Sequence, residues 1–393
     1  MVLGVGAVGE VIAKHLSGDN KVSLILADVD ESRLMKLKRM LRGRKLETVK
    51  IGEKPLEDAV DNAEMVINAA KPSINLDLMK TCEKHGVHYM DLASDTIEEQ
   101  LSMDEEWKRK DILGLICMGE DPGLSNIYAR FAADKLEKIR SIKVRDGEFS
   151  KSRKYPLVAL FSPEIFFEEI LAPSQVYVDG RYRRLPAFSG HEIYQFPEPI
   201  GKLSVYSVDH EEVYTLPKFI RKGIRYVDFK LALDDELIQA VKLFKKIGLL
   251  KSRKMRVKGQ TVAPRDVLFA LMPRPSEISR HIEGHASLVV EVEGENNGRN
   301  TRYKLYTLLS HEDAHRKFGV NATAYLTGTV PALVASMIAR GEIEAKGVIV
   351  PEQLEPEPII EEAAKKDVLS YIETSEEGLM SKHYQSSQHG LAV

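Results

Sequence analysis

Three glycines at the start of the chain stand where a bound phosphate would need them. Gly4, Gly6 and Gly9 form a GxGxxG pattern, and Asp28 follows 19 positions later, after an apolar run from Val22 to Ala27. Glycines let the backbone approach a pyrophosphate, helix-start N–H groups bind its charge, and a carboxylate accepts hydrogen bonds from a ribose. The pattern predicts a dinucleotide site. NAD is favoured because a carboxylate repels a 2′-phosphate, while a nearby arginine keeps NADP possible.

The DPG turn is a second candidate for chemistry. Asp121 stands at the end of an apolar run and is followed by Pro122, Gly123 and a helix start. An acid at a strand end beside a cofactor can act as a general base or bind an ammonium group, although it can equally begin a turn. For Tyr89 two interpretations stay open, a core aromatic residue or a member of a proton relay.

The elements that must hold these residues alternate between strand and helix. Strands are expected over 22–27, 45–51, 65–69, 88–92 and 113–118, and a helix over 76–85 ending at Gly86. This order predicts an α/β fold with a Rossmann-type, doubly wound parallel sheet, in which ligands bind beyond the carboxyl ends of the strands. The expected cofactor contacts are Gly4, Gly6, Ala7, Val8, Gly9, Asp28, Asn68, Ala69, Ala70, Lys71, Asp91 and Leu92.

Composition limits the partners. The chain has 393 residues, enough for two or more domains, with 56 basic and 59 acidic side chains, and nothing in this balance favours nucleic acid or a membrane. A small-molecule ligand is expected instead. The two cysteines, Cys82 and Cys117, fall in apolar segments and are expected to be reduced thiols of a cytoplasmic protein.

A zinc-protease pattern offers a rival hypothesis. His311, Glu312 and His315 fit HExxH, in which two histidines one helical turn apart bind the metal. Against a metal site, Ser310 is expected to cap the helix and Gly319 to end it after about two turns, so His311 would lie in the first turn. No third ligand stands at a persuasive position, and no metal is expected.

Several segments together resemble one family. The segments are GVGAVG (4–9), VINAAKPSIN (66–75), HGVHYMDLAS (85–94), GEDPGLSN (119–126) and TAYLTGTVPA (323–332). In this order they resemble the saccharopine dehydrogenase family. The resemblance implies a dinucleotide-binding domain over 1–126 that is completed by 319–365. It also implies an inserted α+β substrate and dimerisation domain over 127–318, followed by a polar C-terminal tail over 366–393.

Within the inserted domain the pattern predicts both strands and helices. The expected strands are 157–161, 175–178, 203–208, 227–233, 287–292 and 303–309, and the expected helices are 163–170 and 235–247. An antiparallel sheet edge in this domain makes a homodimer the expected assembly.

The resemblance also implies a reaction. A carbon bearing an amine gives hydride to the nicotinamide, and water hydrolyses the resulting imine. By this likeness Asp121 is the acid of the DPG turn and Tyr89 lies near the reacting amine. Saccharopine, cleaved to aminoadipate semialdehyde and glutamate, is the first expected substrate. Alternatives are free lysine, as in lysine 6-dehydrogenase, or carboxynorspermidine; a dinucleotide-binding regulator without turnover is a more remote possibility.

Substrate carboxylates would need cationic side chains. Arg145 and Lys230 are the expected contacts, although solvated surface charges are the common alternative. Gly123, Asn126 and His285 are the other residues expected to contact the substrate.

Overall fold

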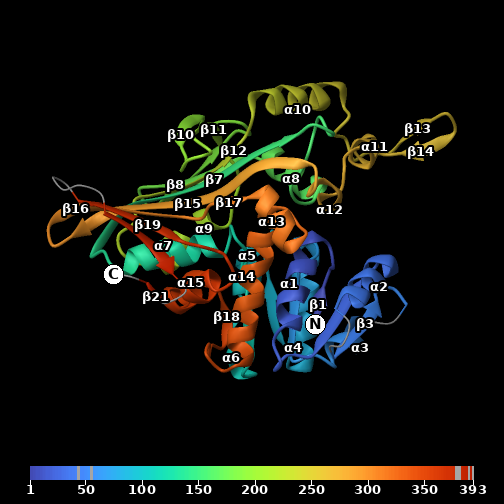
Figure 1. Ribbon diagram of the computed structural model, residues 1–393, viewed down its shortest axis with the longest axis horizontal. Coiled ribbons are helices and arrows are strands. Elements are labelled where there is room, and N and C mark those ends of the chain that lie inside the picture. The colour runs from blue at the N-terminus through green and yellow to red at the C-terminus, as the bar shows by residue number, and fades with distance from the viewer. Residues whose placement is uncertain (42–44, 54–55, 377–381, 388–389, 392–393) are drawn as a thin grey trace.

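The computed structural model describes residues 1–41, 45–53, 56–376, 382–387 and 390–391 (Figure 1). Two large sheets dominate the molecule, with helices between them and on their outer sides. The chain builds most of the first sheet, then the second, and afterwards returns to the first.

The first sheet consists of seven parallel strands in the order β18-β6-β5-β4-β1-β2-β3. The order reverses beside β1, so the glycine turn that follows β1 lies at the switch point where such sheets bind ligands. The predicted doubly wound sheet is therefore confirmed. Its strands are β1 (Val2–Leu3), β2 (Leu24–Asp28), β3 (Leu46–Lys50), β4 (Met65–Asn68), β5 (His88–Asp91), β6 (Leu113–Leu115) and β18 (Gly347–Ile349).

Helices alternate with these strands, as the sequence pattern predicts. Helix α4 ends at Gly86, which has the left-handed conformation (φ 70°) expected of a C-terminal glycine. The helices are α1 (Ala7–Ser17), α2 (Glu31–Met40), α3 (Leu56–Val60), α4 (Asn75–His85), α5 (Ile97–Leu101), α6 (Asp104–Arg109) and the short 3₁₀ turn η1 (Pro72–Ile74).

Helix α14 (Ala322–Ala339) packs against α1 through a glycine. A Cβ atom at Gly328 would lie 2.7 Å from the Cβ of Val11 and 2.8 Å from the carbonyl oxygen of Val8. In the described part of the chain α14 is the one helix long and apolar enough to span a membrane, but 83% of it is buried inside the protein. Such burial is typical of a core helix.

The second sheet has twelve strands, with the main order β10-β11-β12-β7-β15-β16-β19-β20-β21. Its centre is the pair β7 and β15, 15 residues each, which run antiparallel. The strands are β7 (Lys138–Ser152), β8 (Ser174–Val178), β9 (Arg181–Leu185), β10 (Glu192–Gln195), β11 (Lys202–Ser207), β12 (Tyr226–Ala232), β15 (Ile282–Asn296), β16 (Arg299–Tyr306), β17 (Leu309–Ser310), β19 (Tyr371–Glu376), β20 (Lys382–Ser387) and β21 (Gly390–Leu391).

Helices cover this sheet, and a separate hairpin projects from the same end of the molecule as α11 (Figure 1). The helices are α7 (Leu124–Asp134), α8 (Pro163–Leu171), α9 (Glu212–Phe219), α10 (Asp235–Ile247), α11 (Pro264–Leu271), α12 (Pro275–Ile278), α13 (His311–Phe318), α15 (Pro356–Ala364) and the 3₁₀ turn η2 (Pro351–Gln353). The hairpin consists of β13 (Met255–Val257) and β14 (Gln260–Val262).

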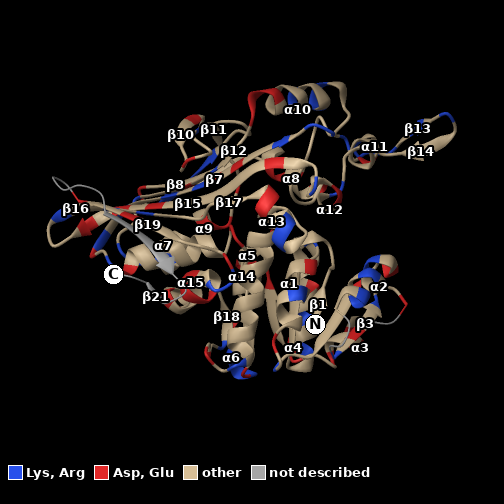
Figure 2. Ribbon diagram, in the orientation of Figure 1, with Lys and Arg blue, Asp and Glu red and all other residues tan. Residues whose placement is uncertain are grey.

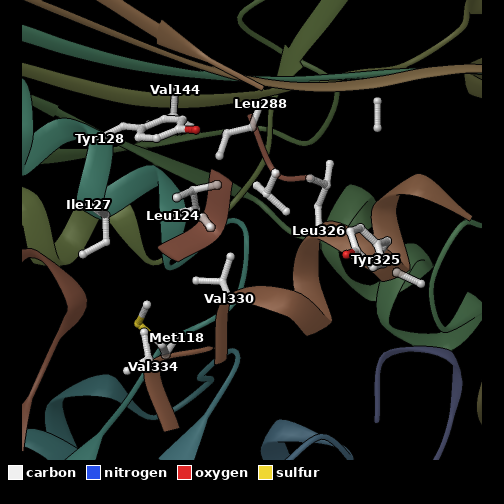
Figure 3. Close-up of a cluster of buried hydrophobic side chains, with 14 of the residues drawn as sticks. Met118, Leu124, Ile127, Tyr128, Val144, Leu288, Tyr325, Leu326, Val330 and Val334 are labelled. Carbon is white, nitrogen blue, oxygen red and sulfur yellow. The ribbon is translucent and has the colours of Figure 1, made fainter. Parts of the chain in front are cut away.

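One hydrophobic core joins the two sheets. Figure 3 shows Leu124 and Tyr128 of α7 and Val330 of α14 beside Val144 and Leu288, which come from β7 and β15. All five side chains are at most 1% exposed. The nucleotide domain is therefore packed against the second sheet along a continuous apolar contact.

Two expectations about the chain were wrong. Residues 157–161 form no strand, because this segment crosses from β7 to α8 as an irregular loop. Residues 366–393 were expected to be a polar tail, but β19 pairs antiparallel with β16 from Thr301↔Glu376 to Tyr306↔Tyr371. A strand of an antiparallel sheet can be apolar on one face only, so the composition of β19 resembles that of a tail.

We expect Gly328→Val to disrupt the packing of α14 on α1. The added side chain must displace the backbone of α1, and overpacking of this kind costs about 1–3 kcal/mol. Thermal unfolding should show a lowered midpoint, whereas Lys80→Val on the exposed side of α4 should leave it nearly unchanged. Equal stability of the two variants would contradict the close helix contact.

Candidate active site

The glycine turn after β1 has the geometry of a phosphate cradle. A Cβ atom at Gly4 (φ 89°) would lie 2.9 Å from the backbone of Ala69, and one at Gly9 would lie 1.9 Å from the Gly4 oxygen. At Gly6 a Cβ atom would meet nothing within 4 Å, and no side chain caps α1. The uncapped helix start therefore opens onto free space, where its N–H groups can bind a pyrophosphate.

Asp28 is fixed beside this turn. Its Oδ2 accepts the N–H of Val5 at 2.7 Å, and its Oδ1 accepts the N–H of Asp30 at 2.8 Å. Each carboxylate oxygen can accept a further bond, so a ribose hydroxyl can be bound here. Arg33, the arginine that could bind a 2′-phosphate, is paired with Asp30 at 3.3 Å.

The Asn68–Lys71 loop, which follows β4, is held by buried amides. The Asn68 side chain accepts the N–H of Ala70 at 3.0 Å and donates to Asn75 at 2.7 Å. Tyr89 donates to the same oxygen of Asn75 at 2.9 Å. The loop therefore sits beside Gly4 in one conformation and can form one wall of the dinucleotide site.

Asp91, at the end of β5, accepts hydrogen bonds from two other segments of the nucleotide domain. It accepts the N–H of Cys117 at 2.7 Å and the amide of Gln100 at 2.6 Å, and burial raises its pKa to about 7. The backbone of Leu92 comes close to Gly119, since a Cβ atom there would be 3.1 Å from the Leu92 oxygen. These contacts bring the end of β5 against the DPG turn.

The DPG turn is a tight loop closed by backbone bonds. The N–H of Gly119 donates to Pro122 at 2.7 Å, and the peptide between Asp121 and Pro122 is cis. Gly123 (φ 134°) has no room for a Cβ atom, which would lie 2.2 Å from the Gly119 oxygen. Asn126 accepts the N–H of Gly123 at 2.9 Å, so the turn and the start of α7 form one unit around Asp121.

Asp121 is surrounded by other carboxylates. Burial raises its pKa well above the usual range, and Asp146, Glu120, Glu212 and Glu148 raise it further. These neighbours come from the same turn, from β7 and from α9. Asp121 is half-buried, so it can exchange a proton with a bound ligand.

The acidic group extends to α8 and α9. Glu169 lies 4.0 Å from Nε2 of His210, while Glu212 and Glu211 lie 2.5 and 3.5 Å from Nδ1. Burial acts to lower the pKa of His210, but Glu212, Glu211 and Glu169 raise it to about 10. We call the eight residues the acidic cluster: Glu120, Asp121, Asp146, Glu148, Glu169, His210, Glu211 and Glu212.

Hydrogen bonds connect the acidic cluster to the nucleotide domain. Ser125 of α7 donates to Glu212 at 2.6 Å, and the N–H of Ser94 after β5 donates to Glu211 at 2.6 Å. Thr323 of α14 donates to Glu148 at 2.5 Å. The cluster therefore lies where the carboxyl ends of β5 and β6 meet the second sheet, beside the predicted cofactor loops.

Comparison with known proteins identifies the family. The saccharopine dehydrogenase NADP binding domain matches residues 1–115, and the saccharopine dehydrogenase C-terminal domain matches residues 119–368. The chain belongs to the saccharopine dehydrogenase family. It is accordingly an NAD(P)-dependent oxidoreductase acting on CH–NH groups, and the glycine turn, Asp28 and the Asn68–Lys71 loop fit the dinucleotide.

Two relatives found by sequence comparison are named for substrates other than saccharopine. The chain is 26% identical to carboxynorspermidine synthase of Vibrio cholerae, across 91% of this chain and 93% of that protein. It is 24% identical to carboxyaminopropylagmatine dehydrogenase of Synechocystis, across 92% and 94%. Saccharopine dehydrogenase from Saccharomyces cerevisiae shares the fold, with a TM-score of 0.71 at 14% identity over 95% of this chain and 98% of that one.

The structure does not bring Arg145 and Lys230 to Asp121. Arg145 and Asp146 are consecutive on β7, so their side chains point to opposite faces of the sheet. Arg145 pairs with Asp228 at 2.8 Å, and Lys230 pairs with Glu192 at 2.7 Å. Both cations are neutralised on the far face, and a substrate contact is not supported for either.

Tyr89 lies in apolar surroundings and is not part of the acidic cluster. It is fully buried, lies edge-on to Trp107, and belongs to a separate apolar cluster of the nucleotide domain. Burial raises its pKa well above the usual range. Of the two interpretations, the core aromatic residue is the one this placement supports, with its hydroxyl holding Asn75.

Asn126 and Gly123 do lie beside Asp121, but the Asn126 side chain is fully engaged. It donates to Thr215 at 3.1 Å and to Glu352 at 3.0 Å, in addition to its bond with Gly123. Its role here is to position the turn.

His285 lies in β15 opposite Ser310, beside the HExxH segment. Ser310 caps α13 as predicted, and buried His311 accepts the N–H of Ala322 at 3.2 Å. Among the described residues, three metal-capable atoms come within 4.8 Å of one another only at His210, Glu211 and Glu212. In this part of the chain the structure therefore brings no third ligand atom to the HExxH histidines.

The acidic cluster itself was missed by sequence reasoning. Its members are spread over 93 positions, and a local motif marks only Glu120 and Asp121. One available signal was the Asp146-x-Glu148 spacing, which places two acids on the same face of a strand.

We expect Tyr89→Phe to affect stability and leave catalysis almost unchanged. The variant removes one buried hydrogen bond to Asn75, which corresponds to about 0.5–1.5 kcal/mol. Chemical denaturation would measure this loss, and steady-state kinetics would measure turnover. A large fall in kcat with unchanged stability would instead place the phenol in the reaction.

Proposed function

We propose that this chain is a dehydrogenase of a carboxylated polyamine, a substrate with several positive charges and a single carboxylate. The observation that carries the proposal is the charge of the acidic cluster. Seven carboxylates surround the DPG turn, and His210 is the single basic side chain in that cluster. Such a site favours cationic ligands over anionic ones.

Saccharopine fits this site poorly. It carries more carboxylates than lysine, and each would meet the carboxylates of the cluster. A like-charge pair at 4 Å costs about 1 kcal/mol in water and about 4 kcal/mol at a partly buried surface. With Arg145 and Lys230 on the opposite face, the described residues offer no arginine or lysine in the cluster to offset this repulsion.

The names of the relatives agree with a cationic substrate. Carboxynorspermidine and carboxyaminopropylagmatine are both polyamine-type cations that carry a carboxyl group. Carboxynorspermidine was the third substrate expected from the sequence, behind saccharopine and lysine. The charge of the cluster is an independent reason to place it first.

In the mechanism we propose, Asp121 accepts the proton of the reacting amine in the oxidative direction and returns it in the reverse direction. In the oxidative direction the amine loses a proton, its carbon loses hydride, and water hydrolyses the imine to an amine and an aldehyde. When bound, the nicotinamide accepts that hydride or, in the reverse direction, supplies it. Burial and neighbouring acids raise the pKa of the Asp121 carboxyl group, which favours its taking up the proton, and such catalysis contributes about 10² to 10⁴ in rate.

The remaining carboxylates orient the substrate. Asp146 and Glu148 from β7 and Glu169 from α8 can bind the distal cations and so hold the reacting carbon at a fixed place relative to Asp121. The bonds from Ser125 and Ser94 keep α9 in register with the nucleotide domain.

We also propose that NAD is the preferred coenzyme. Asp28 occupies the ribose position, and Arg33 is paired with Asp30. A cytoplasmic location is proposed too, supported by the buried free thiols of Cys82 and Cys117.

A substrate panel tests the proposal. Purified protein would be assayed for nicotinamide absorbance change with NAD(H) and NADP(H), crossed with carboxynorspermidine, carboxyaminopropylagmatine, saccharopine and lysine. We expect activity with the carboxylated polyamines and little with saccharopine. A kcat/KM for saccharopine similar to that for the carboxylated polyamines would contradict the argument from charge. Activity with lysine alone would select the lysine 6-dehydrogenase alternative.

Asp121→Asn should lower turnover at least about tenfold, because the proton acceptor is lost while the side chain keeps its shape. Coenzyme affinity, measured by fluorescence quenching, should stay near that of the wild type. Unchanged turnover would remove Asp121 from the mechanism.

Activity should fall as the pH drops below about 7. The pKa values of Glu148 and Glu169 are raised to about 7, chiefly by burial, so both carboxylates gain protons and lose charge on the acid side. The KM for a polyamine substrate should therefore rise with acidity. Glu169→Gln should raise KM at pH 8 and weaken this pH dependence; an unaltered profile in that variant would exclude Glu169 from substrate binding.

Asp28→Asn should weaken NAD binding roughly tenfold or more, since a hydrogen bond to a charged group contributes about 1.5–3 kcal/mol. It should also reduce discrimination against NADP. Asp30→Asn is the matched control for NAD affinity, because asparagine still caps α2 and Asp30 lies outside the ribose position. It is no control for NADP affinity, since it removes the carboxylate that pairs with Arg33. Calorimetric titration with both coenzymes compares the variants.

A further inference from the structure

A cavity of about 300 Å³ lies where α13 and the start of α14 meet α1 (Figure 1). This volume is within the range of small-molecule sites, which begins at about 300 Å³. The cavity is separate from the glycine turn, because His15 lies about 12 Å along the helix axis from Ala7, the first residue of α1. Its walls are Val11, Lys14 and His15 of α1, Lys317 and Phe318 of α13, and Tyr325 of α14.

The apolar part of the wall is aromatic and flat. The rings of Phe318 and Tyr325 are stacked, with centroids 3.6 Å apart and planes at 5°. The Tyr325 hydroxyl donates to the Lys366 carbonyl oxygen at 2.7 Å, which fixes the pair in place. Val11 contributes an aliphatic surface on the α1 side. Such walls favour a flat apolar ligand body.

The hydrogen bonds of His15 decide which ring nitrogen is left for a ligand. Its Nε2 lies 3.1 Å from the Thr329 hydroxyl oxygen, and that hydroxyl donates its one hydrogen to the Tyr325 carbonyl oxygen at 2.6 Å. The Thr329 oxygen therefore accepts from Nε2–H of His15. Burial, with contributions from Lys366 and Lys14, lowers the pKa of His15 to about 4, so the ring is neutral near pH 7. A neutral ring protonated at Nε2 has a lone pair at Nδ1 and accepts a hydrogen bond there.

The lysines that line or approach the cavity are only partly neutralised. Lys14 pairs with Glu10 at 2.6 Å, and Lys317 pairs with Asp367 at 3.7 Å. Lys366, which also acts on the histidine, forms no ion pair in the part of the chain that the structure describes. Figure 2 shows basic residues on α1 and towards the end of α13. Three lysines and two carboxylates together favour a ligand with one negative charge.

We propose that this cavity is a binding site for a hydroxylated aromatic carboxylate. The ring of the ligand packs on Val11 and Phe318, its carboxylate meets Lys14 and Lys317, and its hydroxyl donates to Nδ1 of His15. The inference does not depend on the proposed substrate, because no residue of the acidic cluster takes part.

The two sites described above do not compete for such a ligand once the coenzyme is bound. The glycine turn is then filled by the pyrophosphate, and the carboxylates of the acidic cluster repel an organic anion. Inorganic phosphate is the competing ligand within the cavity, since it can also use the lysines. It would leave the aromatic wall and the histidine acceptor unused, so these walls favour the aromatic ligand.

Calorimetric titration of the full-length protein, saturated with coenzyme, tests the site with para-hydroxyphenylacetate as the probe. Phenylacetate lacks the hydroxyl, and para-hydroxyphenethyl alcohol lacks the carboxylate. We expect the probe to bind and each partial ligand to bind about two- to tenfold more weakly, as for the loss of one hydrogen bond or one exposed charge contact. No binding of the probe in the millimolar range, equal affinity for all three compounds, or displacement of the probe by an equal concentration of phosphate overturns the proposal.

Charge reversal tests the carboxylate contact. The Lys317 side chain is 49% exposed, so Lys317→Glu should fold normally. We expect it to weaken the probe at least about fivefold and to leave para-hydroxyphenethyl alcohol unaffected. Lys80→Glu makes the same charge change on the exposed side of α4 and is the matched control. An equal affinity of the two variants for the probe would contradict the contact.

Replacing the histidine tests the hydrogen bond to the ligand. His15→Phe keeps a ring in place, and Thr329 keeps its bond to the Tyr325 carbonyl oxygen. In this variant the probe should bind no better than phenylacetate, while the affinity for phenylacetate should match that of the wild type. A retained preference for the hydroxylated compound would exclude His15 as the acceptor. Thermal unfolding checks the fold of the variant, and the Lys317→Glu titration tests the site independently of it.

Discussion

The concentration of seven carboxylates around one turn is the constraint on which the rest of the structure depends. Mutual repulsion and burial both act against charged acids at such close range. The protein distributes them over the DPG turn, β7, α8 and α9, and holds several by hydrogen bonds. Ser125 binds Glu212, Ser94 binds Glu211 and Thr323 binds Glu148. His210, stacked flat on Phe229 with ring centroids 3.7 Å apart, provides one internal cation.

These bonds come from the nucleotide domain and reach side chains that approach from the second sheet. The acidic cluster therefore also fixes the two parts of the chain relative to each other. Asn126 adds to this with bonds to Thr215 of α9 and Glu352 of η2. Since α7, α14, β7 and β15 share one apolar core, the carboxylates are held on a rigid frame, and a substrate meets a preformed site.

Local signals predicted the nucleotide domain and helix α10 of the second domain well because local interactions decide them. The glycine turn, the helix stop at Gly86 and the limits of α10, set by the cap Asp234 and by Gly248, can each be read from a few neighbouring residues. The predicted substrate contact of Arg145 is not supported, because the face to which a strand residue points depends on register with β12 and β15. Sequence spacing does not reveal this register. The acidic cluster was missed for the same reason, since long-range pairing assembles it.

Strand register also decides which charge β7 presents to the proposed substrate site. The DPG turn and the cofactor loops belong to the parallel sheet, whereas the carboxylates proposed to bind the substrate's distal groups belong to the second sheet and its helices. Those groups meet β7, where a cation and an anion stand at consecutive positions, Arg145 and Asp146. Side chains alternate between faces with a period of two, so a shift of one residue in the pairing of β7 would turn the cation inward and the acid outward. The proposed preference for a cationic substrate therefore depends on the register of β7, whereas the proposed proton transfer depends on the DPG turn.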